Sequence, residues 1–296
     1  MLTSLFSLIL VAAVPIVQTD TSFSVPMGSR LALHNFAGTV TVRPAAHNRV
    51  RILATHPQLV RVIVNQAGSS YDVRARGLEL PQPPVDYVIT APSWMSLDLE
   101  GFHCDMDIDG WKSDVLAETV RGGVRLRGGL GLIRLSSMTG GVNVIGAQGR
   151  MQLSSVESGV AVHDATGEIT IEAVNGNVVL DRVRSRLVEA GTVNGDVTFT
   201  GWIDALGRYR LASHRGNLDV LLPTVVDATV IVSTFSGGFQ SAFPMRPGAL
   251  RPGRSFSFAL GDGRARVELQ SFEGRINVRQ GEMPVAMPQP PPALDR

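Results

Sequence analysis

The sequence predicts an all-β fold built as a single-chain β-solenoid, similar to a parallel β-helix, with coils of about 18–21 residues. Three observations predict it: a short glycine-containing phrase recurs eight times, apolar and polar residues alternate within it, and its apolar positions are rich in β-branched residues. The chain has 296 residues with Gly 31 and Pro 17, which indicates many turns, and 44% of its residues are hydrophobic. That fraction is enough for a sizeable core.

The repeated phrase is a glycine (a serine in one copy), a variable residue, and then an apolar, a polar and an apolar residue. Its copies begin at Gly122, Gly140, Ser158, Gly176, Gly195, Gly216, Gly237 and Gly274, and subtraction gives steps of 18, 18, 18, 19, 21, 21 and 37. Strands that stack once per coil need a near-constant step. Asn175–Gly176 and Asn194–Gly195 are typical of tight hairpins, so an antiparallel meander is the alternative.

A second strand is expected in each period. Its inward pairs are Ile133 and Leu135, Met151 and Leu153, Ile169 and Ile171, Val188 and Ala190, Tyr209 and Leu211, Val230 and Val232, and Val267 and Leu269. Three residues after each pair we expect a further core column, formed by Met138, Val156, Val174, Val193, His214, Phe235 and Phe272. Cys104, the single cysteine, is expected in the core as well.

The N-terminus predicts export. Leu5–Val17 is nearly all apolar and too short to span a bilayer, which is typical of a signal peptide over residues 1–19. Cleavage after Ala13 and cleavage near Thr19 both fit, and a retained anchor is the alternative. We expect a mature chain without a transmembrane span, located in the periplasm, on the outer surface or outside the cell.

Three further segments follow the leader. Residues 20–92 are expected to form an irregular β-rich N-terminal cap, because open solenoid ends aggregate unless they are covered. Residues 93–280 are the solenoid repeats, and residues 281–296 are a proline-rich disordered tail. The doubled step before Gly274 predicts an inserted loop at residues 243–255.

The stretch from Phe23 to Arg279 resembles a bacterial β-strand-repeat family of unknown function labelled putative adhesin. The segments that carry the resemblance are Gly28–Val42, Val85–Pro92 and the Val-Asn-Gly repeats at Val174 and Val193. The resemblance implies an exported, β-helical, non-catalytic protein of the cell envelope, and it supplies no catalytic residues.

The segment Asp105–Gly110 matches the first half of an EF-hand calcium loop, but position twelve is Leu116 rather than an acid. We therefore expect no metal there. Alternation would point Cys104, Met106 and Ile108 inward and the three aspartates outward. At a step of 20, Asp105 would face Arg125 and Asp107 would face Arg127, forming a ladder of ion pairs.

The residues predict no catalytic, cofactor-binding or metal site. His163 and Asp164 are sequence neighbours, so on a strand they point to opposite faces, and His214 is expected at a half-buried corner. Hydrolase, zinc-protease and dinucleotide-binding motifs are missing from the sequence. A formal net charge of +1 gives no drive toward nucleic acid.

An interaction function is therefore expected, as an adhesin-like or envelope-associated binding module. Residues 246–279 hold seven arginines against three acids, and Arg246, Arg251 and Arg254 fall in the inserted loop. Arginine forks suit carboxylate and phosphate, so the expected partner is an anionic glycan or envelope polymer, or else a protein. Arg182, Arg184 and Arg186 are a second candidate for the same role. The alternatives are a polysaccharide lyase or hydrolase and a self-assembling rod; the sequence does not define the oligomeric state.

Overall fold

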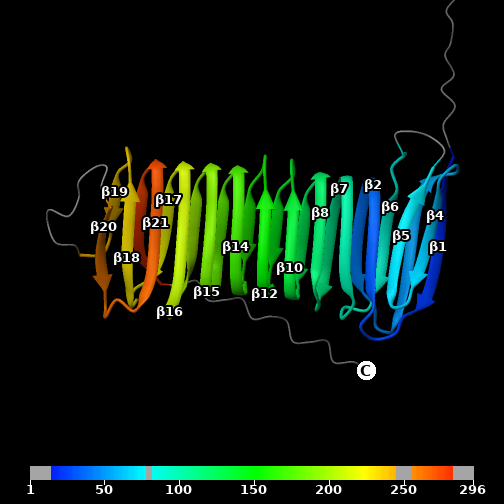
Figure 1. Cartoon of the computed structure of the whole chain (residues 1–296), viewed down its shortest axis with the longest axis horizontal. Helices are drawn as coiled ribbons and strands as arrows, with labels where there is room; N and C mark the ends of the chain where they lie inside the picture. The colour runs from blue at the N-terminus through cyan, green and yellow to red at the C-terminus, as the bar shows by residue number, and fades with distance from the viewer. Residues whose placement is uncertain (1–14, 78–81, 245–254, 283–296) are drawn as a thin grey trace, which may run out of the picture.

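The computed structural model describes residues 15–77, 82–244 and 255–282. These residues form an all-β fold of 22 strands, with no helix in the described part of the chain. The strands lie side by side along an elongated rod, with the N-terminal strands at one end (Figure 1). Over those same ranges, nothing helical is long and apolar enough to cross a membrane.

The strands have the following bounds. The first seven are β1 (Ile16–Ser24), β2 (Arg30–Pro44), β3 (Arg49–Pro57), β4 (Arg61–Ala67), β5 (Ser70–Arg76), β6 (Asp86–Ala91) and β7 (Ser96–Trp111). The middle eight are β8 (Val115–Arg121), β9 (Val124–Gly128), β10 (Leu130–Ser137), β11 (Val142–Ile145), β12 (Gln148–Ser155), β13 (Val160–His163), β14 (Thr166–Asn175) and β15 (Val178–Asn194). The last seven are β16 (Val197–Arg215), β17 (Leu218–Pro223), β18 (Ala228–Thr234), β19 (Phe239–Ser241), β20 (Ser255–Leu260), β21 (Ala265–Glu273) and β22 (Ile276–Gly281).

The middle of the rod consists of two layers of parallel strands. Layer A contains β8, β10, β12, β14 and the later parts of β15 and β16, and layer B contains β9, β11, β13 and the earlier parts of β15 and β16. In layer B, Val124 pairs with Val142, Val142 with Val160, and Val160 with Val178. The predicted step of 18 residues is therefore confirmed here. The strands on either side of Asn175–Gly176 pair in parallel, so this dipeptide does not close a hairpin.

The core lies between the layers and is lined by the inward pairs that alternation predicts. Ile133, Leu135, Met151 and Leu153 are buried, and the equivalent pairs in the later strands are buried too. Cys104 is fully buried, as expected. Each strand contributes alternate side chains, so the core is a stack of aliphatic residues one or two side chains deep.

A column of buried hydroxyls closes one edge of the core. Ser137 Oγ donates to the carbonyl of Gly122 at 2.8 Å, and Ser155 Oγ donates to the carbonyl of Gly140 at 2.9 Å. Thr119, Thr192, Ser213 and Ser271 make equivalent bonds. Because every hydroxyl has a partner, this polar column satisfies corner carbonyls rather than destabilising the core.

Antiparallel strands lie at both ends of the rod. At the N-terminal end, β1 pairs with β3, β3 with β6, and β4 with β5, all antiparallel, and β2 then joins this group to β7 in parallel. At the other end, β20 pairs antiparallel with β18. At this second end, β19 keeps the parallel direction and pairs with β22, so only β20 breaks the parallel repeat there.

The last repeats are exchanged in space, which the sequence order did not predict. β21 lies between β16 and β18, and β22 lies between β17 and β19. The copy at Gly274 consequently stacks on Gly216, and the copy at Gly237 stacks outside it. The expected inserted loop is thus part of a longer segment. Along the chain, the outer strands β18, β19 and β20 come first, and β21 and β22 follow and lie inside them, next to β16 and β17. Its residues 245–254 lie outside the described residues.

The first strand overlaps the expected leader. Ile16 pairs with Pro57 and Thr19 with Ala54, so the last four residues of the segment 1–19 belong to β1. Residues 1–14 lie outside the described residues, as do residues 283–296 of the expected tail.

Candidate functional site

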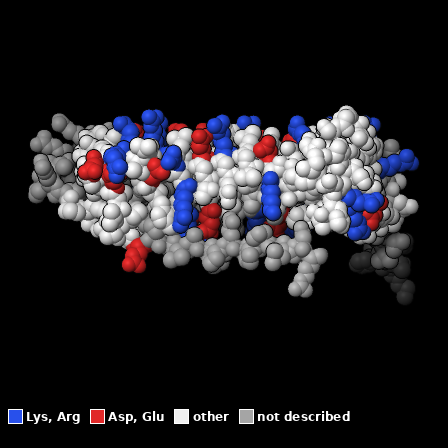
Figure 2. All heavy atoms as spheres, turned by 90° about the horizontal axis from the view of Figure 1, so that it is seen from below, with Lys and Arg blue, Asp and Glu red and all other residues white. Residues whose placement is uncertain are grey.

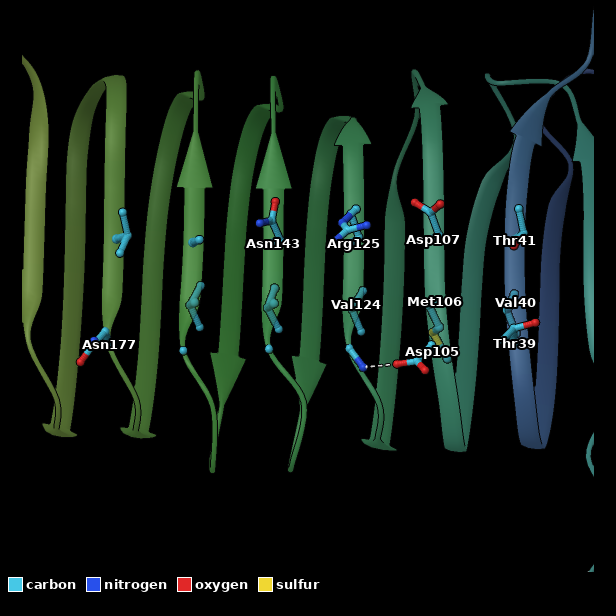
Figure 3. A pocket seen from close by; sticks show the side chains of 17 residues that line it. Thr39, Val40, Thr41, Asp105, Met106, Asp107, Val124, Arg125, Asn143 and Asn177 are labelled. Atoms are coloured by element: carbon cyan, nitrogen blue, oxygen red, sulfur yellow. Dashed lines mark hydrogen bonds between the residues drawn. The ribbon is translucent and has the colours of Figure 1, made fainter. Parts of the chain in front are cut away.

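A groove of about 740 Å³ runs over layer B, across β2, β7, β9, β11, β13 and β15 (Figure 3). Two rows of residues line it. The first row, at the starts of the strands, is Thr39, Asp105, Gly123, Gly141, Gly159 and Asn177, and the second row, two residues later, is Thr41, Asp107, Arg125, Asn143, Ala161 and Val179. Both rows run along the rod because the strands are stacked in register.

Glycines make the floor of the groove low. Gly159 is required by close packing, since a Cβ there would lie 2.6 Å from the carbonyl oxygen of Asn177. Close packing does not require a glycine at position 123. The φ of Gly123 is outside the left-handed region, and a Cβ there would lie 3.4 Å from its nearest atom, the carbonyl oxygen of Gly141. A side chain at Gly123 is therefore sterically permitted, and its absence leaves space that a ligand can fill.

The end of the groove nearest the N-terminus is polar and balanced in charge. Asp105 Oδ1 accepts a hydrogen bond from the backbone N–H of Gly123 at 2.7 Å, which Figure 3 marks. Asp107 Oδ2 accepts from Arg43 Nη2 at 2.8 Å. Arg125 lies between Asp107 and Asn143 on the neighbouring strands (Figure 3), and it makes no hydrogen bond or ion pair with another described residue. It is thus the cation of the groove that is available to a ligand.

The other end of the second row is apolar. Ala161 and Val179 follow Asn143 along the row, and the backbone of Gly141 and Gly159 lies beside them. The groove therefore offers hydroxyl, carboxylate and guanidinium groups over β2, β7 and β9, amide groups at Asn143 and Asn177, and apolar surface at Ala161 and Val179. An elongated ligand with both hydroxyl groups and apolar faces matches this order.

The expected ion-pair ladder has a different register from the one predicted. Asp107 lies opposite Arg125, and Asp109 forms the pair with Arg127, at 3.7 Å, because the step is 18 and not 20. Cys104, Met106 and Ile108 do point inward. Within the described ranges no group of three or more His, Cys, Asp or Glu residues is placed to hold a metal ion.

His163 and Asp164 do not pair with each other, as alternation predicted, and both bond to the next coil. His163 Nδ1 lies 3.3 Å from Asp181 Oδ2, and Arg182 donates to both carboxylate oxygens of Asp164 at 2.7 Å. Asp164 and Arg182 have φ values of 53°, in line with glycines at the same corner of earlier coils. The hydrogen bonds from Arg182 lower the pKa of Asp164. This cluster fastens one corner of the rod and is separate from the groove.

The predicted third core column lies on the surface. The exposed fractions are 51% for Met138, 39% for Val174 and 63% for Phe235, and His214 is exposed and stacked on Phe272 with ring centroids 4.8 Å apart. The prediction was wrong because Ser137, and not Met138, is the next inward residue after Leu135. The inward position is taken by a hydroxyl whose hydrogen bond is satisfied, so the apolar side chain falls outside.

Some arginines of the two predicted clusters form ion pairs within the described part of the chain. Arg264 pairs with Asp227 and Arg266 with Glu268. Figure 2 shows positive and negative side chains interspersed along the visible face rather than gathered into one large patch of a single sign. Arg246, Arg251 and Arg254 lie outside the described residues.

Sequence reasoning missed Gly123, Gly141 and Arg125 as site residues. The signal was present in the variable position of the phrase, which is Gly in the copies at Gly122, Gly140 and Ser158 and becomes Asn or Asp in the next three. Glycines in repeats are usually assigned to corners, and only the register shows that three of them share one surface row.

No protein-family model and no curated protein matches this sequence. Among solved structures, the chain is similar to a putative adhesin from Parabacteroides merdae at TM-score 0.44 and 10% identity, covering 90% of this chain and 96% of the other. A putative lipid binding protein from Parabacteroides distasonis gives 0.42 and 8%, covering 90% and 97%. A putative adhesin from Bacteroides fragilis gives 0.38 and 11%, covering 90% and 98%. These TM-scores are below 0.5, so the similarity does not assign a function to this chain.

Proposed function

We propose that this protein is an exported, non-catalytic, adhesin-like binding module, built as a β-solenoid, whose layer B groove holds an extended glycan of the cell envelope. The observation that carries the proposal is the groove itself, which crosses six neighbouring strands. Gly123, Gly141 and Gly159 lower its floor at three of them, beside a row whose first four residues are polar. A linear ligand lying along the rod would contact the same two positions on every coil.

The charge balance of the groove favours a hydroxyl-rich chain over a strongly anionic one. Asp105 and Asp107 would repel a polyanion, whereas the exposed carboxylate of Asp105 accepts hydrogen bonds from hydroxyl groups. Arg125 supplies donors for ring or hydroxyl oxygens. For this groove we therefore propose a glycan of low charge, instead of the anionic polymer that the sequence predicted.

One observation favours the lyase or hydrolase alternative: Asp105, Asp107 and Arg125 line the same groove. Both carboxylates are, however, tied to the rod: Asp105 by the backbone of Gly123 and Asp107 by Arg43. Incubating the glycan with the protein and measuring its chain length tests this alternative. Shortening by the wild type that is lost in Asp107→Ala would show that the protein is an enzyme.

The self-assembling rod is the second alternative, and the antiparallel strands β1, β4 and β20 at the ends of the rod disfavour it because they do not continue the parallel stacking. The solenoid is supported by the constant register of layer B, and export by the apolar leader. Filaments that lengthen with protein concentration in electron micrographs would favour assembly instead.

Retention on immobilised envelope glycan fractions tests the proposed function. Gly123→Leu fills the groove, whereas Gly191→Leu places the same side chain at a layer A position where a Cβ would meet its nearest atom at 3.8 Å. We expect the wild type and Gly191→Leu to be retained and Gly123→Leu to elute early. Equal retention of the two variants, with both folded by circular dichroism, would contradict the groove as the site.

A further inference from the structure

A short bulge interrupts the regular stacking where the repeat lengthens. On β15 one residue, Arg186, separates Ser185 from Leu187, whereas on β16 four residues separate their partners Ile203 and Arg208. The extra residues lie between the layer B and layer A parts of β16, and among them Leu206 is 76% exposed. Insertions of this kind in a repeat are frequent sites of function, because the neighbouring coils keep the scaffold rigid.

A buried tyrosine holds the bulge in one conformation. Tyr209 Oη donates to the carbonyl of Ser185 at 2.5 Å and accepts from the backbone N–H of Asp204 at 2.8 Å. Gly207 packs against the same ring so closely that a Cβ would lie 2.5 Å from it. The bulge is therefore a fixed element, which is what a preorganised site requires.

The bulge presents an aromatic ring beside an arginine. The guanidinium carbon of Arg184 lies 4.1 Å from the centroid of the Trp202 ring, in a pocket of about 630 Å³. A guanidinium that lies over an aromatic ring uses its face for that contact, and its in-plane N–H groups are then free to bind an anion. Among the described residues, no acid forms an ion pair with Arg184, although it is exposed.

The other charges around the pocket are already paired. Glu168 accepts from Arg150 Nε at 2.8 Å, and Asp204 accepts from Arg186 Nε at 3.0 Å. Of the two arginines that line the pocket, Arg184 and Arg186, Arg184 is therefore the one without an acid partner. Arg182, the third arginine of the predicted cluster, is held by Asp164.

We propose that Arg184 and Trp202 form an oxyanion site that binds a carboxylate or sulfate group of an acidic glycan. The planar guanidinium takes two oxygens of the anion at once, and the half-buried indole contacts the apolar face of the sugar ring that carries it. This site is separate from the groove in layer B and does not depend on the function proposed for it.

Calorimetric titration of the full chain tests the site, with polygalacturonate as the carboxylate probe and dextran sulfate as the sulfate probe. Neutral dextran and sodium sulfate serve as controls for the polymer and for the ion alone. We expect at least one acidic polymer to bind, and binding to fall about tenfold or more in Arg184→Gln. The comparison of the two polymers identifies the anion.

Matched variants separate this site from general charge effects. Arg210→Gln removes the same charge from an exposed arginine of layer A that pairs with Glu189, and we expect it to bind as the wild type does. Binding should change the tryptophan emission of the wild type and not that of Trp202→Phe. Equal loss in Arg184→Gln and Arg210→Gln, or no binding of either acidic polymer, would overturn the proposal.

Discussion

Met151 and Met138 provide a matched test of which repeat column forms the core. Met151 is fully buried in register between Ile133 and Ile169, whereas Met138 is 51% exposed. Truncating a buried methionine to alanine removes its transfer free energy and leaves a cavity, which together cost about 2–5 kcal/mol. Met138→Ala leaves no enclosed cavity and should cost about 1 kcal/mol or less.

The assay is urea unfolding of both variants, followed by circular dichroism. We expect the unfolding midpoint to fall clearly for Met151→Ala and only slightly for Met138→Ala, with similar slopes, so that the two free energies of unfolding differ by about 1 kcal/mol or more. The chemical change is the same in both, so side-chain chemistry does not explain a difference. Equal losses, or a larger loss for Met138→Ala, would refute the assignment of the two columns.

Three further predictions concern titration, reactivity and processing. Hydrogen bonds from Arg182 lower the pKa of Asp164. The ionised carboxylate therefore stabilises the folded protein fully above the ordinary pKa of 3.8, and this stabilisation is lost as the pH falls through the lowered pKa. Asp164→Asn should therefore cost about 1–2 kcal/mol at pH 7 and flatten the acid limb in melts from pH 6 to 2; an unchanged acid limb would contradict this role. Burial raises the pKa of Cys104 to about 11, so the contribution of the neutral thiol to the stability of the fold is lost as the pH rises above the ordinary pKa of 9.0. A thiol reagent at pH 8 should label Cys104 only after unfolding. N-terminal sequencing of the exported chain should find a start at or before Ile16, because β1 begins there; a start after Thr19 would contradict the pairing of β1 with β3.

The regular part of the fold could be predicted because its signals are local. The apolar, polar, apolar phrase at Val124 to Leu126 recurs at the observed step, and the inward pairs follow from alternation. The exposed column was mispredicted since hydrophobicity alone favoured Met138 over Ser137, and a hydrogen bond to Gly122 makes the buried serine acceptable. The burial of Ser137 thus depends on a hydrogen-bond partner that lies 15 residues away in the sequence.

The exchange of the last repeats and the site could not be predicted for a different reason. The copies at Gly237 and Gly274 have similar local patterns, so the sequence does not show which of them stacks on Gly216. The groove likewise depends on register. A shift from a step of 20 to one of 18 replaces Arg127 by Arg125 as the neighbour of Asp107 and places Arg125 in the groove.

The most direct measurement is a crystal structure of the protein soaked with an oligosaccharide from the envelope glycan that it retains. We predict ligand density lying along the rod over Gly123, Gly141 and Gly159, with Arg125 in contact with ring or hydroxyl oxygens. Density confined to layer A or to the ends of the rod, with the groove empty at saturating ligand, would contradict the assignment of the groove as the binding site.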